Sequence, residues 1–174
     1  MLAADGASAG EPLAFVRQKK LAIKEDLRFF ADESEREELF RIKARQVFEI
    51  GGRYDVTTPT GERIGVLEKV FGRSLLRSTW RVLDAHEQEV AVAQEKSVPV
   101  AIARRLIDFV PYGELVPIVF QFTILMDGRE AGELRRPLGI RDRYILRLGG
   151  DFERRLDRRL GVALAVALDA LQSR

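Results

Sequence analysis

The stretch Leu160-Gly161-Val162-Ala163-Leu164-Ala165-Val166-Ala167-Leu168 decides the fold, because it has no polar side chain on any helical face. A helix that is apolar all round lies inside a protein core or inside a membrane. A membrane span needs about 20 apolar residues, and Asp169 closes this run well before that length. We therefore expect a helix surrounded by protein, with small residues that let its neighbours approach closely from every side.

The residues before this run predict where the helix begins. Gly149-Gly150-Asp151 is typical of a strand exit into a helix, with Asp151 as the N-cap. Phe152 and Leu156 continue the apolar spacing of the helix, so we expect both to face inward. We predict a central helix over residues 151–172. Its first turns carry four arginines on the opposite side: Arg154, Arg155, Arg158 and Arg159.

The composition favours one globular domain in a chain of 174 residues, of which 46% are hydrophobic. Lys and Arg total 29 against 27 Asp and Glu, so no strong overall field points to nucleic acid. The chain has no cysteine, which excludes disulfides, thiolate metal sites and cysteine nucleophiles. Residues 1–12 lack the pattern of a secretory signal. We expect them to be a disordered tail before a single domain over residues 13–174, in a cytoplasmic protein.

A period of two dominates the chain from Leu13 onward, as in strands with one buried face. Three hairpins each begin with an aromatic residue, turn and return to a basic residue, over residues 54–69, 80–96 and 120–135. In the third, Asp127-Gly128 is a strong signal for a tight turn.

Further strands are predicted from Leu13 to Lys20, at 27–31, at 40–44 and at 144–148. The acidic run 32–38 is expected to be a solvated turn or short helix. A helix over residues 34–48 competes with the strand at 40–44, because its apolar residues also fit helical spacing roughly. Between Pro99 and Pro111, helical spacing predicts a lateral helix.

This inventory predicts a mainly β (α+β) fold, a closed antiparallel barrel of about 10–12 strands enclosing the hydrophobic C-terminal helix. Closing an antiparallel sheet removes its exposed edges. A barrel of about ten strands is too wide for side chains alone to fill, so the helix would fill it.

The order of these elements resembles that of the LURP-one-related proteins, which belong with phospholipid scramblases and tubby C-terminal domains. The resemblance lies in residues 15–19, 38–43, 54–65 and 80–84, and in the terminal helix. It implies a twelve-stranded type of barrel around a helix and a non-catalytic role at membranes or with phosphoinositides. The chain lacks the scramblases' cysteine-rich palmitoylation segment and has no recognisable aspartate-rich calcium segment, which argues against lipid scrambling.

Most candidate sites have a simpler structural interpretation. His86 is the sole histidine and falls at a hairpin turn, so we interpret it as an exposed turn residue. The acidic run Asp32–Glu38 lacks the spacing of a calcium loop, and we interpret it as a solvated connection. The pairs Gly51-Gly52 and Gly149-Gly150 could cradle phosphate but belong to no such motif. We expect turns there, and no catalytic residue, cofactor or metal.

Arginine clusters are the most informative polar feature, because guanidinium groups match phosphate oxygens in bidentate geometry. Apart from the four at the helix start, arginines recur at Arg73, Arg77 and Arg81, at Arg104 and Arg105, and at Arg135, Arg136, Arg141 and Arg143. The candidate anionic-lipid residues are Arg73, Arg77, Arg104, Arg105, Arg154, Arg155, Arg158 and Arg159. The alternative is a solvated collar balanced by neighbouring acids.

The leading hypothesis is a cytoplasmic barrel that binds anionic lipid head groups or a membrane surface as an adaptor, and is not an enzyme. One alternative is a carrier for a small hydrophobic ligand, or a scramblase-like lipid-handling protein. A hydrolase ranks last, because no spacing places two acids together. The sequence does not identify a protein partner.

Overall fold

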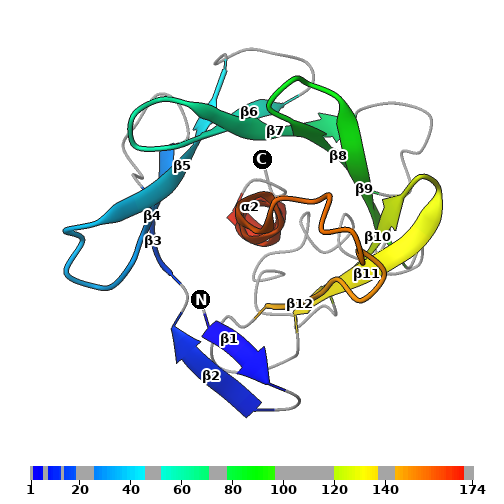
Figure 1. Ribbon diagram of the computed structural model, residues 1–174, viewed down its shortest axis with the longest axis horizontal. Coiled ribbons are helices and arrows are strands. Elements are labelled where there is room, and N and C mark those ends of the chain that lie inside the picture. Colours follow the sequence, from blue (N-terminus) through cyan, green and yellow to red (C-terminus); the bar gives the residue numbers. More distant parts are fainter. Residues whose placement is uncertain are drawn as a thin grey trace, which may run out of the picture.

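The computed structural model describes residues 2–5, 8–12, 14–18, 26–45, 52–70, 78–96, 120–136 and 144–170, in which twelve strands and one helix are assigned. Figure 1 shows the strands arranged around the helix. The elements are β1 (Leu2–Asp5), β2 (Ser8–Pro12), β3 (Phe15–Gln18), β4 (Asp26–Phe30), β5 (Glu38–Ala44), β6 (Arg53–Thr57), β7 (Arg63–Val70), β8 (Thr79–Asp84), β9 (Glu89–Glu95), β10 (Phe120–Met126), β11 (Arg129–Arg136), β12 (Ile145–Arg147) and α2 (Arg158–Ala170).

Ten of the strands form one antiparallel sheet whose spatial order, β3 to β12, is also the order along the chain. The three predicted hairpins are confirmed as β6–β7, β8–β9 and β10–β11. Asp127 and Gly128 both have positive φ, as the predicted tight turn requires. The strands predicted near Phe15, Leu27, Phe40 and Leu146 are confirmed as well.

Two helices that the sequence pattern allowed are not found among the described residues. The competing helix over residues 34–48 is wrong, because residues 31–37 form a turn and β5 follows. Burial of the side chains alternates from Phe40 to Ala44, as in a strand with one buried face. The apolar residues fit this period of two better than the helical spacing, which they match only roughly. The predicted lateral helix between Pro99 and Pro111 lies outside the described residues.

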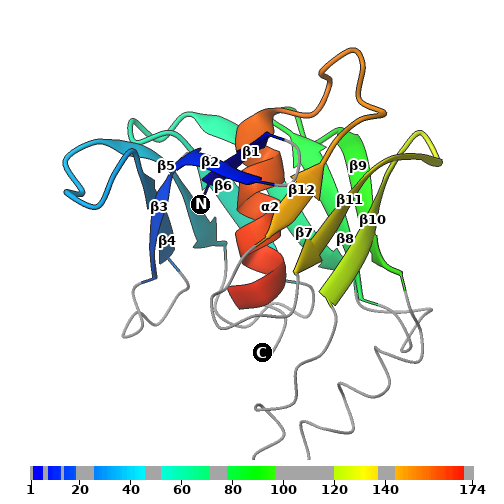
Figure 2. The same cartoon turned by 90° about the horizontal axis from the view of Figure 1, so that it is seen from below.

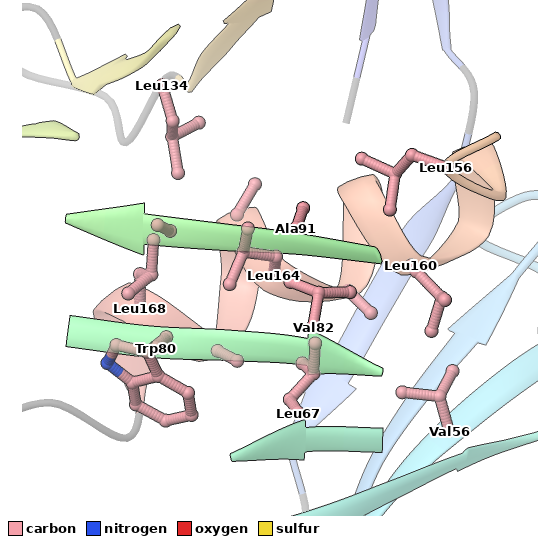
Figure 3. Close-up of a cluster of buried hydrophobic side chains, with 14 of the residues drawn as sticks. Val56, Leu67, Trp80, Val82, Ala91, Leu134, Leu156, Leu160, Leu164 and Leu168 are labelled. Carbon is pink, nitrogen blue, oxygen red and sulfur yellow. The ribbon is translucent and has the colours of Figure 1, made fainter. Parts of the chain in front are cut away.

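The central helix α2 is enclosed, as the apolar run predicts. Ala163, Leu164 and Ala165 have no exposed surface, and Leu160 has 1%. Figure 3 shows leucines of this segment projecting toward the strands that carry Leu67 and Val82. These residues belong to one continuous hydrophobic cluster. A fully buried leucine contributes roughly 1.5–3 kcal/mol, so this contact is a main source of stability.

The predicted start of the helix is wrong. The helix begins at Arg158 and not after Asp151, because residues 151–157 form turns. Arg154 has φ of 52°, a conformation that an α-helix does not allow. Asp157 is the actual N-cap: its carboxylate accepts a hydrogen bond from the backbone N–H of Arg159 at 2.8 Å. As a result Phe152, which was expected to face inward, is 89% exposed.

Closure of the sheet is not confirmed. Its edge strands are β3 and β12, and no pairing joins them among the described residues. Figures 1 and 2 place the separate β1–β2 hairpin at the opening between these edges. The sequence predicts no strand in this segment, whereas the structure assigns two. The division into a tail of residues 1–12 and one domain stays a prediction.

Gly65 sets how closely α2 approaches the sheet. A Cβ atom at this position would lie 2.3 Å from the carbonyl oxygen of Leu83 and 2.8 Å from Leu160 Cδ1. A backbone oxygen cannot be moved as easily as the end of a flexible side chain. An alanine at residue 65 would therefore force either the neighbouring strand or the helix to shift.

We predict that Gly65→Ala lowers the free energy of unfolding by about 2 kcal/mol, a typical cost of overpacking. The matched control is Gly149→Ala, because no atom lies within 4 Å of a Cβ placed there; its effect should stay within about 0.5 kcal/mol. Urea-induced unfolding of the purified variants measures both. Equal stabilities would contradict the close approach of helix and sheet.

Candidate functional site

The topology sorts the connections between strands into two sets at opposite ends of the sheet. Since consecutive strands run antiparallel, every second connection lies at the same end. Figure 2 shows the turns of hairpins β4–β5, β6–β7, β8–β9 and β10–β11 on one side of the molecule, where the chain also enters α2. The strand ends joined by the remaining connections lie at the other end. Residues far apart in sequence are thus gathered by topology alone.

The first set is strongly acidic, and we call it the acidic rim. It comprises residues 31–37, 58–62, 85–88, 127–128 and 148–157. It carries ten acids and three arginines: Asp32, Glu33, Glu35, Glu37, Glu62, Glu87, Asp127, Asp151, Glu153 and Asp157, against Arg36, Arg154 and Arg155. The N-terminus of α2 also lies at this end. Its partial positive charge favours nearby carboxylates.

The second set has the opposite charge in the sequence, and we call its members the basic connections. They comprise residues 19–25, 45–52, 71–78, 96–119 and 137–144. They contain eleven bases and five acids: Lys19, Lys20, Lys24, Arg45, Arg73, Arg77, Lys96, Arg104, Arg105, Arg141 and Arg143, against Glu25, Glu49, Asp108, Glu114 and Asp142. The net charge of the whole chain is therefore near zero although one set of connections is acidic and the other is basic.

Asp151 organises the loop between β12 and α2. Its side chain is 1% exposed, and its carboxylate accepts hydrogen bonds from the backbone N–H groups of Arg155, at 2.8 Å, and Leu156, at 3.3 Å. Arg158 Nη1 lies 3.0 Å from the same carboxylate. A buried charge needs such partners, so Asp151 holds the loop in place although it does not cap the helix.

The four arginines at the helix start are mostly neutralised by acids. Arg155 pairs with Asp127 of the β10–β11 turn, and Arg158 pairs with Asp151. Arg159 Nη2 lies 2.7 Å from Asp157 Oδ2, and its hydrogen bond holds the pKa of Asp157 below the ordinary value. Arg154 alone of the four has no ion pair among the described residues. The alternative of a solvated collar therefore fits three of the four.

The remaining predicted lipid residues, Arg73, Arg77, Arg104 and Arg105, lie outside the described residues. They belong to the basic connections, whereas Arg154 and Arg155 belong to the acidic rim. The topology thus assigns the predicted arginines to two separate sets of connections.

Arginines on the outer surface of the sheet are also paired. Glu87 accepts contacts from three of them: Arg45 at 2.7 Å, Arg63 at 3.0 Å and Arg53 at 3.6 Å. The hydrogen bond from Arg45 is the main reason that the pKa of Glu87 is lowered. Asp55 also accepts from Arg45. Glu68, which pairs with Arg53 at 3.1 Å, is the third acid of this network, so three arginines are matched by three acids among the described residues.

An open pocket of about 520 Å3 lies between the β10–β11 turn and the loop after β12. Four of its lining residues are acids, namely Asp127, Glu130, Asp151 and Glu153, and two are bases, Arg129 and Arg155. Phe152 completes its edge. Arg155 and, more weakly, Arg129 lower the pKa of Asp127. The side chains of Glu130 and Glu153 make no hydrogen bond or ion pair among the described residues, although the charge of Glu153 helps to raise the pKa of Arg155.

Sequence reasoning missed this pocket. The sequence pattern places Phe152 on the inward face of a helix that begins too early, it treats Glu153 only as an acid that balances the arginine collar, and it does not single out Glu130. The sequence does contain one indication of this pocket. Once the hairpins are identified, the acids and bases in every second connection can be counted, and they show an acidic excess in the turns that line it.

The simpler interpretations of the other candidates agree with the structure. His86 is exposed in the β8–β9 turn, and Gly149 and Gly150 form a turn. The acidic run is a solvated connection, in which Asp32 accepts a hydrogen bond from the backbone N–H of Ser34. Within the part of the chain that the structure describes, no three His, Cys, Asp or Glu residues are grouped to hold a metal ion.

The fold defines a β-sheet protein wrapped around a buried helix, with charged residues on the turns at one end of the sheet. The model of the LURP-one-related family matches residues 13–169. The chain therefore belongs to the LURP-one-related family, as the sequence resemblance implies. No curated protein and no solved structure matches it. Among the described residues, no helix is long and apolar enough to cross a membrane.

We predict a graded series of stabilities for three acids of the loop before α2. Asp151→Ala removes a buried acceptor and should cost about 3 kcal/mol. Asp157→Ala removes the N-cap and should cost about 1 kcal/mol. Glu153→Ala, at an exposed residue whose side chain makes no hydrogen bond or ion pair, is the control and should change the free energy of unfolding by less than about 0.5 kcal/mol.

The same series has a pH dependence. Because the pKa of Asp157 is lowered in the folded state, its contribution is present at neutral pH and is lost as the pH falls below about 4. The difference between wild type and Asp157→Ala in urea unfolding should therefore shrink progressively as the pH is lowered below about 4. A difference that stays constant, or an Asp151→Ala variant as stable as Glu153→Ala, would contradict these roles.

Proposed function

We propose that this chain is a non-catalytic adaptor of the tubby-like type that binds anionic lipid head groups at a cytoplasmic membrane surface. The observation that carries the proposal is the excess of bases over acids in the sequence of the basic connections. Membership of the LURP-one-related family supports a non-enzymatic role. The carrier of a small hydrophobic ligand and the scramblase-like protein stay predictions that no specific observation favours.

The basic connections are the end that we assign to the membrane. They hold Arg73, Arg77, Arg104 and Arg105 of the predicted lipid residues, whereas the acidic rim would be repelled by anionic lipid. Each Lys or Arg near an anionic surface contributes about 1 kcal/mol. Arg45 of these connections is paired with Asp55 and Glu87. The remaining ten bases exceed the five acids by five, which is enough for reversible binding without any inserted helix.

The described residues around these strand ends are consistent with this assignment. Lys96, directly after β9, is exposed. Val70 at the end of β7 is 42% exposed and is one of two large hydrophobic residues found exposed in the part of the chain that the structure describes. An apolar side chain beside basic residues suits the boundary between head groups and acyl chains.

The test is co-sedimentation with phosphatidylglycerol and phosphatidylcholine vesicles. We predict that the wild-type protein binds the anionic vesicles preferentially and that Arg104→Glu/Arg105→Glu binds them about thirty-fold more weakly. Raising the salt concentration should weaken binding, because screening shortens the reach of exposed charges.

The matched control is Arg36→Glu/Arg154→Glu, which makes the same change in net charge on the acidic rim. Both residues are exposed there, so this variant should bind within about two-fold of wild type if the rim faces away from the bilayer. Equal binding to both lipids, or an equal loss in the two double variants, would reject the proposal.

A further inference from the structure

The opening of the sheet brings together two unfavourable features of the backbone. β3 and β12 are the edge strands, and among the described residues neither is paired on its outer side. The β1–β2 hairpin lies at this opening (Figures 1 and 2) but forms a separate two-stranded sheet. Unpaired edges expose rows of N–H and C=O groups, and an isolated two-stranded hairpin is at best marginally stable in water.

A third feature is a stripe of α2 that the sheet does not cover completely. Among the residues after Arg159 whose side chains the structure describes in α2, all are buried except Val162, Val166 and Ala170. These three recur every four residues, so they lie on one face of the helix. We call them the α2 stripe. They pack against the hydrophobic core but remain partly exposed, which costs part of the stabilisation that full burial would give.

The contacts of the neighbouring helix residues show which way the α2 stripe faces. Leu160 faces β7, since a Cβ atom on Gly65 would contact its side chain, and Gly161 faces Leu146 of β12. Successive residues turn by about 100° around the helix axis, so Val166 lies about 120° from the first contact and about 140° from the second. The stripe therefore faces away from both strands, and we place it at the opening between β3 and β12.

The directions of the edge strands determine what fits between them. Because each of the ten strands runs antiparallel to the next, β3 and β12 run in opposite directions. One added strand would be parallel to one of these edges, whereas an added hairpin is antiparallel to both. Antiparallel pairs are slightly more stable per residue and need only a short turn to join them. A two-stranded hairpin is thus the smallest insertion that keeps the whole sheet antiparallel.

The β1–β2 hairpin meets this requirement in length and connection. β1 and β2 have four and five residues, against four in β3 and three in β12. β2 ends at Pro12 and β3 begins at Phe15, so the hairpin stays close to the β3 edge. Proline at residue 12 suits the second position of a type I turn over residues 11–14, and loops built around such a turn commonly join antiparallel strands.

We propose that the β1–β2 hairpin is a strap that closes the sheet over the α2 stripe, with β2 paired to β3 and β1 paired to β12. Closure gives both edges a partner and shields the stripe, so one movement removes all three unfavourable features. Release of the strap exposes the stripe and leaves the other ten strands in place. The family match begins at residue 13, so the strap lies outside the matched region. This inference does not depend on membrane binding.

Thiol labelling measures whether the strap covers the stripe. The chain has no cysteine, so Val166→Cys introduces a single thiol whose reaction with a water-soluble maleimide can be timed. Ala4 and Ala9 lie opposite each other in the hairpin. Residues in such a pair bond either each other or the outer neighbours, and proline has no N–H to donate. Ala4→Pro/Ala9→Pro should therefore release the strap and speed labelling at least about ten-fold, since local opening exposes the thiol.

The matched control is Ala4→Val/Ala9→Val on the same Val166→Cys background. It changes the same two residues but keeps both N–H groups and favours strands, so its labelling rate should stay within about two-fold of the parent. Equal labelling rates in the proline and valine variants would mean that the hairpin does not cover the stripe, and they would overturn the strap.

Hydrogen exchange of the same proteins gives an independent measurement that also detects a general loss of structure. The outward-facing amides of β3 and β12 should be protected in the parent and lose protection in the proline variant, because only the strap can pair with them. The amides of β7 and β8 should keep their protection in both. Unprotected edge amides in the parent would overturn the strap. Loss of protection in β7 and β8 as well would show that the hairpin does not open on its own, and would overturn it too.

Discussion

Burial of α2 is the constraint on which the rest of the structure depends. A helix with leucine, valine and alanine on every face cannot remain in water, so the sheet must surround it. Small residues make this possible: Ala163, Ala165 and Ala167 are fully buried, and Gly65 lets the neighbouring strands approach α2 without a side chain between them. The small residues make α2 narrow enough for the sheet to wrap around it.

The same topology decides which connections share an end of the sheet. A sheet in which each strand pairs with the next along the chain places alternate connections at opposite ends. The helix runs from one end toward the other (Figure 2), and its macrodipole favours acids where it begins. Asp151 and Asp157 use this preference to order the loop and start the helix. Other rim acids also pair with arginines: Glu35 with Arg17, Glu87 with Arg45, and Asp127 with Arg155.

Much of the fold could be predicted from the sequence. The period of two and the Asp127-Gly128 turn identified the hairpins, and the apolar run identified the buried helix. The start of the helix could not be predicted, because Phe152 and Leu156 fit helical spacing whether or not the backbone is helical. Asp151 and Asp157 are both acceptable N-caps, and only the positive φ of Arg154 distinguishes them.

Likewise, arginine clusters suggested an anion site, but the acids that neutralise Arg155, Arg158 and Arg159 come partly from a turn about 28 residues away.

The most direct test of this account is native-state hydrogen exchange of the backbone amides from Leu164 to Leu168. If α2 lies inside the sheet, these amides can exchange only when the sheet itself opens. They should then show the same exchange free energy as the amides of the central strands β7 and β8, equal to the global free energy of unfolding. Exchange from α2 at a much lower free energy than from β7 and β8 would show that the helix leaves the sheet without unfolding it, and would contradict the enclosed helix.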